Sequence, residues 1–140
     1  MNFKNDLAFG ESYELELLKH IPHDKYNKPD GKFKDYDLEI IHNDKSIYYE
    51  VKADRKASLT GNLAIEYECF NKPSGIATTK ADYYAYFIIN GDDYDLYIIP
   101  VKEIITLIQI KDYKRIVKGG DYNKSKLFLF ELYKFNEYKI

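Results

Sequence analysis

The stretch Tyr48-Tyr49-Glu50-Val51-Lys52-Ala53 decides both the predicted fold and the predicted chemistry of this chain. Its tyrosine and valine residues, with the Ser46 and Ile47 that precede them, are typical of a β-strand. Because side chains alternate between the two faces of a strand, Glu50 and Lys52 share one face and Val51 lies on the other. An acid and a base side by side in so apolar a run indicate either an ion pair or chemistry.

A second strand, predicted over Asp37–His42, precedes this one, and Asn43-Asp44-Lys45 between them has the composition of a hairpin turn. A hairpin folded symmetrically about Asp44 places Asp37 opposite position 51, within one residue of Glu50. The sequence therefore predicts two carboxylates and a lysine at one end of a hairpin.

A helix is predicted over Leu7–Ile21, because apolar residues recur there at helical spacing and Pro22 follows as a stop. Glu14 lies within the apolar stripe, where an acidic side chain is costly unless it meets a cation or a hydrogen-bond donor. Gly10, four residues earlier, would allow a backbone or a substrate to approach closely. Glu11 remains an alternative to Glu14 as the helix carboxylate.

Carboxylates grouped with a lysine are typical of a site for a hard divalent cation. Mg²⁺ binds oxygen ligands and keeps several waters, so one or two carboxylates with a backbone carbonyl suffice. Such a cation polarises a phosphoryl oxygen and lowers the pKa of its bound water. Lys52 would offset the negative charge that develops in the transition state, or position the attacking water. These residue types predict a phosphodiester substrate.

The order of these features, a helix with Gly10 and Glu14, then Asp37, then Glu50-Val51-Lys52 on the next strand, resembles the PD-(D/E)XK nuclease superfamily. The Gly-x-x-x-Glu helix is similar to that of archaeal Holliday-junction resolvases and related phage endonucleases. The resemblance spans about residues Phe9–Ile89. It implies an α/β (α+β) fold with a restriction-endonuclease-like αβββαβ core, in which helices flank a central mixed sheet.

The same resemblance implies a DNA endonuclease that hydrolyses phosphodiester bonds with Mg²⁺ or Mn²⁺. Branched, Holliday-junction-like DNA is the candidate substrate, and a homodimer is the candidate assembly. Lys52 would serve catalysis, and the remaining residues would bind the metal. The residues assigned in this way are Glu14, Asp37, Glu50, Lys52 and, through its backbone carbonyl, Val51.

One position departs from the family pattern. Tyr36 stands where the family has a proline before the aspartate, and the literal Pro29-Asp30 pair lies upstream in a predicted turn. Asp30 therefore remains an alternative to Asp37.

Contacts to nucleic acid are predicted next to the same strand. Arg55 and Lys56 follow it directly and are candidate partners of backbone phosphates, as are Lys32 and Lys34. Another candidate segment, Thr78-Thr79-Lys80, would either hold a phosphate at a helix N-terminus or serve as an ordinary helix cap.

The rest of the chain predicts further strands and helices. Glu66, on a third strand that would complete an antiparallel meander, either approaches the carboxylates or faces solvent, and the pattern favours solvent. Aromatic residues between 127 and 135 would either stack on bases or pack in the core or at a dimer contact, and their alternation favours packing. The predicted elements are a strand over Leu63–Phe70, a short helical segment over Thr78–Asp82, a hairpin of Tyr84–Ile89 with Tyr94–Pro100, a helix over Val101–Ile110 and an edge strand over Leu127–Phe135.

Composition limits the function classes. The 140 residues correspond to a single domain, residues 1–140, and 45% are hydrophobic. The 21 basic and 23 acidic residues give a net charge of −2, which excludes wrapping of nucleic acid by bulk positive charge. The single cysteine, Cys69, excludes an internal disulfide and a cysteine-based zinc site.

No sequence feature predicts a signal peptide or a membrane span, so a cytoplasmic protein without a membrane partner is expected. A non-catalytic module that binds nucleic acid or protein while retaining the nuclease fold is the alternative function.

Overall fold

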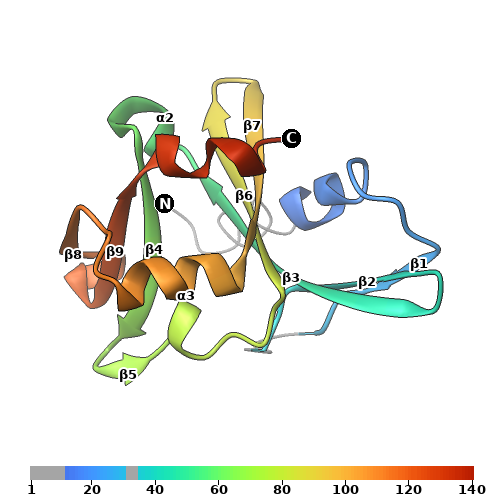
Figure 1. The fold of residues 1–140 in the computed structure, drawn as a ribbon, viewed down its shortest axis with the longest axis horizontal. Coiled ribbons are helices and arrows are strands. Elements are labelled where there is room, and N and C mark those ends of the chain that lie inside the picture. The colour runs from blue at the N-terminus through green and yellow to red at the C-terminus, as the bar shows by residue number, and fades with distance from the viewer. Residues whose placement is uncertain (1–11, 31–34) are drawn as a thin grey trace.

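The structure is a computed structural model that describes residues 12–30 and 35–140. The described strands form a five-stranded sheet, in the order β1-β2-β3-β6-β7, and a four-stranded sheet, in the order β5-β4-β9-β8 (Figure 1). Residues 12–17 are helical. The elements that follow are β1 Lys25–Asn27, β2 Leu38–His42, β3 Lys45–Asp54, α2 Ala57–Thr60, β4 Asn62–Cys69, β5 Lys72–Pro73, η1 Gly75–Ala77, β6 Tyr83–Asn90, β7 Asp93–Pro100, α3 Val101–Gln109, β8 Arg115–Gly119, η2 Asp121–Asn123, β9 Ser125–Glu131 and η3 Leu132–Tyr138.

The first sheet is mixed, because β3 and β6 pair in parallel while its other pairs are antiparallel. A parallel pair requires a crossover connection, and this crossover contains α2, β4, β5 and η1. The predicted α+β class and mixed sheet are therefore confirmed. The restriction-endonuclease-like core is not established by the topology, since the described chain is mostly sheet.

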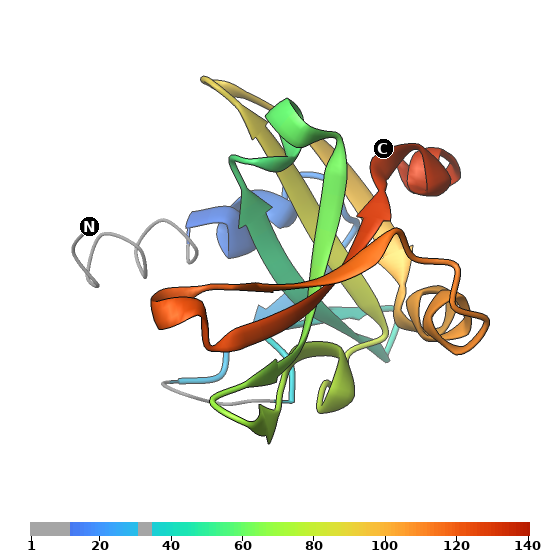
Figure 2. The same cartoon turned by 90° about the vertical axis from the view of Figure 1, so that its left-hand side faces the viewer.

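The predicted three-stranded meander is wrong, because β4 leaves the first sheet and pairs with β5 and β9. Gly61, with φ +71°, ends α2 in the left-handed conformation and redirects the chain. Leu63 and Ile65 are then buried in one cluster with Tyr84 and Tyr86 of β6. Burial of this apolar face between sheets is what takes β4 out of the first sheet. Figure 2 shows the second sheet toward the viewer.

The two faces of the first sheet bury different partners. Phe87 and Tyr49 belong to a cluster with Leu17, which comes from the helix of residues 12–17. The opposite face, with Tyr84 and Tyr86, packs on the second sheet, α3 and η3. The Tyr86 hydroxyl donates a hydrogen bond shared between Asp54 Oδ2 and the Ala64 carbonyl, each at 3.1 Å, which ties β3 and β6 to β4.

Three further expectations are corrected. The helix ends at residue 17 rather than 21, and residues 18–20 form a turn. No helical segment covers residues 78–82, because η1 ends at Ala77 and the chain then extends into β6. The last strand, β9, lies between β4 and β8 and is not an edge. Its Phe130 is fully buried, as is Phe135 beyond it, which confirms the core role of these rings.

The β6–β7 hairpin and helix α3 are confirmed. Val101 and Ile104 form the buried side of α3. Among the described residues, the structure has no helix long and apolar enough to cross a membrane.

Candidate active site

Asp37 is held at the end of the β2–β3 hairpin by two backbone interactions. Its N–H donates to the Tyr49 carbonyl at 2.9 Å, and its Oδ2 accepts from the Val51 N–H at 2.8 Å. The hairpin register pairs Leu38 with Tyr49, so Asp37 continues it opposite Glu50. The turn contains Asn43 and Asp44 alone, both with positive φ, which is one residue shorter than predicted. The shorter turn moves Asp37 from position 51 to Glu50.

Glu50 lies in the middle of β3 and is buried, with 9% of its surface exposed. Its Oε1 accepts a hydrogen bond of 2.9 Å from the Thr79 hydroxyl. Burial, and after it the negative charge of Asp37, raises the pKa of Glu50 to about 7, although Lys52 and the Thr79 hydroxyl oppose the shift. The site therefore holds a carboxyl group whose charged form is only partly compensated, beside a second carboxylate.

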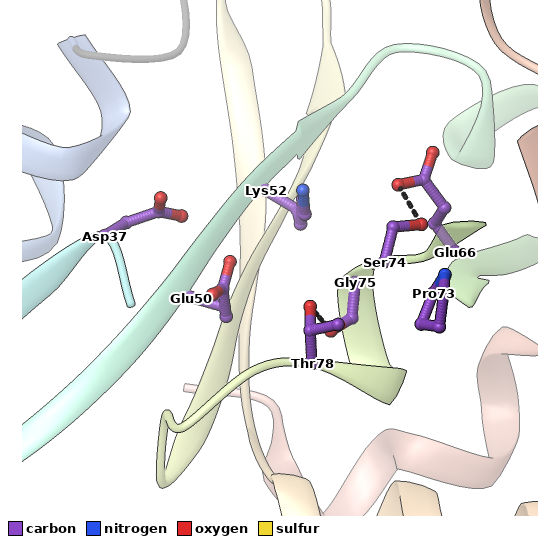
Figure 3. Close-up of a pocket in the computed structure, with 8 residues that line it drawn as sticks. All are labelled: Asp37, Glu50, Lys52, Glu66, Pro73, Ser74, Gly75 and Thr78. Carbon is purple, nitrogen blue, oxygen red and sulfur yellow. Dashed lines mark hydrogen bonds between the residues drawn. The ribbon is translucent and has the colours of Figure 1, made fainter. Parts of the chain in front are cut away.

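Glu50 and Lys52 point to the same side of β3, as predicted, and open into a cavity of about 220 Å³ (Figure 3). This cavity, which we call the carboxylate pocket, lies between β3 and the crossover segments β4, β5 and η1. Lys52 is exposed, and no carboxylate of the described chain lies within 4.0 Å of its Nζ. The carboxylate pocket is lined by Asp37, Glu50, Lys52, Glu66, Pro73, Ser74, Gly75 and Thr78.

Glu66 forms the far side of the carboxylate pocket, so the favoured solvent-facing interpretation was wrong. Its Oε2 accepts a hydrogen bond of 3.0 Å from the Ser74 hydroxyl (Figure 3). Gly75 has φ +53°, and a Cβ there would lie 2.2 Å from the Glu66 backbone oxygen. Only glycine permits this contact between η1 and β4. The sequence alone could not place Glu66 in the carboxylate pocket, because strand alternation does not indicate which sheet β4 joins.

Glu14 does not line the carboxylate pocket. The helix of residues 12–17 packs on the sheet face that carries Tyr49, whereas Glu50 shares the opposite face with its register partner Tyr84. Glu14 Oε2 forms an ion pair of 3.0 Å with Lys28. Its predicted place among the metal ligands is therefore not supported by the geometry. The alternative Glu11, and Gly10, lie outside the described residues.

Asp30 is exposed and does not line the carboxylate pocket, so the structure favours Asp37. Val51 faces the opposite side of β3, and its backbone N–H holds Asp37.

The predicted nucleic-acid contacts fall in two places. Arg55 and Lys56 are exposed just beyond β3, where Asp54 Oδ1 accepts from the Lys56 N–H at 2.7 Å. Thr78 lines the carboxylate pocket, and the Thr79 hydroxyl donates to Glu50. Because η1 ends at Ala77 and no helix follows it before β6, these threonines do not form a helix N-terminus that could hold a phosphate. Lys80 is exposed. Lys32 and Lys34 lie outside the described residues.

The donor set fits a hard cation that keeps most of its water. Within residues 12–30 and 35–140, no three His, Cys, Asp or Glu side chains are grouped so that they could hold a metal ion. On this side of the pocket, the two carboxylates that could hold such an ion are Asp37 and Glu50, beside open volume. Two carboxylates with water are typical of Mg²⁺ sites.

Comparison of the chain with protein-family models, with curated proteins and with solved structures finds no match.

Proposed function

We propose that this protein is a metal-dependent endonuclease that hydrolyses phosphodiester bonds in DNA. The proposal is carried by the buried Glu50 beside Asp37, on one side of an open cavity that also exposes Lys52. A carboxylate pair that is only partly compensated gains most from a divalent cation, which relieves both the burial and the mutual repulsion.

Each residue has a distinct part in the proposed reaction. Asp37, fixed by the Val51 N–H, offers its second oxygen, and Glu50 offers a carboxylate held by Thr79. A bound Mg²⁺ or Mn²⁺ supplies an activated water and polarises a phosphoryl oxygen. Lys52 places a positive charge where negative charge develops on the phosphate.

The opposite side of the carboxylate pocket carries hydroxyl groups that are already hydrogen-bonded. The Thr78 hydroxyl donates to the Gly75 carbonyl at 3.4 Å, and the Ser74 hydroxyl donates to Glu66 at 3.0 Å. A hydroxyl has one proton to donate, so a phosphate would receive a hydrogen bond from either group only in exchange for these contacts. Lys52 is therefore the residue of this lining that would hold a substrate phosphate.

Incubation of the purified protein with linear, supercoiled and four-way-junction DNA, in Mg²⁺, Mn²⁺ or EDTA, tests the proposal. We expect nicking with a divalent cation and none in EDTA. Asp37→Asn should abolish nicking, whereas Asp44→Asn, the same change in the turn at the other end of the hairpin, should not. Nicking that survives Asp37→Asn would overturn the assignment of the site.

Preference for the junction over linear DNA would assign branched DNA as the substrate. Binding without cleavage under every cation would reject the enzyme and leave the non-catalytic binding module.

A further inference from the structure

A second cavity, of about 180 Å³, lies at the end of the second sheet. There the β4–β5 turn meets the connection between β8 and β9, and the Phe70 N–H donates to the Lys124 carbonyl at 3.0 Å. We call this cavity the lysine pocket. Its lining residues are Asn71, Lys118, Asn123, Lys124 and Lys126.

The lysine pocket concentrates positive charge at a cost to the sheet. Lys118 and Lys126 are directly opposite partners on antiparallel β8 and β9, and like charges in this arrangement are destabilising. Glu68 compensates Lys126 through an ion pair of 2.9 Å. Among the acidic side chains that the structure describes, none lies within 4.0 Å of the Nζ of Lys118 or Lys124. The arrangement therefore suits an anion.

Two exposed aromatic residues are sequence neighbours of residues that line the lysine pocket. Phe70 precedes Asn71 and is 55% exposed, and Tyr122 precedes Asn123 and is 87% exposed. Both rings occur at left-handed backbone positions, with φ +50° and +57°. Bulky residues are disfavoured there, and rings in solvent contribute little to the core. Neither packing nor turn geometry accounts for them.

The lysine pocket and the carboxylate pocket are joined by the two-residue strand β5. Asn71, just before β5, lines the lysine pocket, and Pro73, within β5, lines the carboxylate pocket. Lys72 lies between them and is exposed. Residues at either end of the Asn71–Pro73 segment thus line the two cavities, with a lysine between them.

We propose that the lysine pocket binds a single-stranded segment of nucleic acid. Lys118, Lys124 and Lys126 hold a backbone phosphate, and neighbouring bases stack on Phe70 and Tyr122. Single-stranded binding combines these two elements, a basic groove and aromatic platforms. The continuation of the strand into the carboxylate pocket rests on the proposed function, whereas binding at the lysine pocket does not.

Fluorescence anisotropy with a labelled single-stranded oligothymidylate in EDTA tests the phosphate contacts without cleavage. For Lys118→Ala/Lys124→Ala we expect several-fold weaker binding at low salt. The slope of log K against log salt should fall by about 1.4, because each lysine contact to a single strand contributes about 0.7. The matched control, Lys45→Ala/Lys102→Ala, removes the same charge at exposed positions on β3 and α3. Equal loss in both double variants would overturn the proposal.

The stacking contribution is tested separately. We expect Tyr122→Ala to weaken oligothymidylate binding about tenfold, with Tyr122→Phe close to wild type. The control is Tyr133→Ala, which removes an exposed ring from η3, beyond the opposite end of β9. Wild-type affinity of Tyr122→Ala, or binding of a blunt duplex as tight as that of the single strand, would reject the single-stranded assignment.

The two proposals fail in distinguishable ways. If no cation supports nicking but Lys118→Ala/Lys124→Ala still weakens binding selectively, the nuclease proposal fails and the lysine pocket stands. If DNA is nicked but both double variants bind alike, only the lysine pocket is rejected.

Discussion

The carboxylate pocket and the lysine pocket lie on either side of β5 and hold charge in opposite ways. In the carboxylate pocket, Glu50 is 9% exposed and receives a hydrogen bond from Thr79. In the lysine pocket, Lys118 and Lys124 project from loops and strand ends into solvent. Buried charge is expensive and is sensitive to each neighbour, whereas exposed charge is cheap and is screened by salt. The first arrangement suits selective chemistry, and the second suits adjustable binding.

The difference also appears in the backbone. Gly75 brings η1 against a carbonyl of β4, so the carboxylate pocket has a rigid wall. At the lysine pocket, a Cβ on Gly120 would meet the Ser125 hydroxyl at 2.8 Å, and a side chain can move aside.

The largest contrast is expected between two lysine substitutions. Lys52→Ala should reduce the nicking rate about 100- to 1000-fold, as loss of one transition-state charge partner typically does. Its binding of the single strand in EDTA should stay close to wild type. Lys118→Ala should weaken that binding and leave the rate at saturating DNA unchanged. Single-turnover nicking and anisotropy measure the two effects, and equal behaviour of the two variants would remove the distinction between the pockets.

The second contrast is in pH dependence. The pKa of Glu50 is raised from 4.5 to about 7 in the folded protein, so the folded state binds more protons than the unfolded state between these values. Below pH 4.5 the carboxyl group of Glu50 is protonated in both states and its burial costs little. As the pH rises from 4.5 to 7, the free energy of unfolding falls by about 3 kcal/mol, because only the unfolded state can ionise this group freely. In EDTA, Glu50→Gln should therefore be more stable than wild type at pH 8 by about that amount.

Urea unfolding at pH 4.5 and pH 8 measures this difference. Glu137→Gln, at an exposed position of η3, is the matched control and should follow the wild-type profile. A Glu50→Gln variant with the wild-type pH profile would show that Glu50 is not a buried, uncompensated carboxyl.

The third contrast is between two glycines with positive φ. Gly75→Ala and Gly120→Ala share the strain of the left-handed conformation, at +53° and +67°. Gly75→Ala also forces a carbonyl of β4 to move. We expect it to lower the free energy of unfolding by about 2 kcal/mol more than Gly120→Ala does. Equal losses by urea unfolding would mean that the wall of the carboxylate pocket is not rigid.

The smallest effect is expected from Ser74→Ala. Loss of its hydrogen bond to Glu66 should lower the free energy of unfolding by about 1 kcal/mol. The control is the same substitution in a Glu66→Ala background, where the acceptor of the hydrogen bond is already missing. An equal loss of stability in both backgrounds would show that the hydrogen bond does not hold this side of the pocket.

Local patterns predicted the part of the site that one hairpin builds. Strand alternation placed Glu50 and Lys52 on one face, and turn composition brought Asp37 to within one residue of its observed partner. The error of one residue came from the turn, because Asn43 and Asp44 alone form it. The positions of these hairpin residues are predictable because the residues that interact are close in sequence.

Contacts between distant segments were not predictable in this way. Glu66 reaches the carboxylate pocket because β4 pairs with β9, some 60 positions further along the chain, and nothing near Glu66 encodes that choice. The lysine pocket likewise depends on the meeting of two turns. Glu14 was misplaced because an apolar stripe shows that a helix packs on a sheet, but not on which face.

The crossover also determines when the site comes into existence during synthesis. Strand β4 carries Glu66, and its long partner strand, β9, ends at Glu131. Pairings between such distant segments form late, after the local hairpins. A nascent chain that has exposed only β2 and β3 outside the ribosome has the carboxylates but no opposite side to the pocket. The enclosed pocket is complete only once residue 131 has emerged.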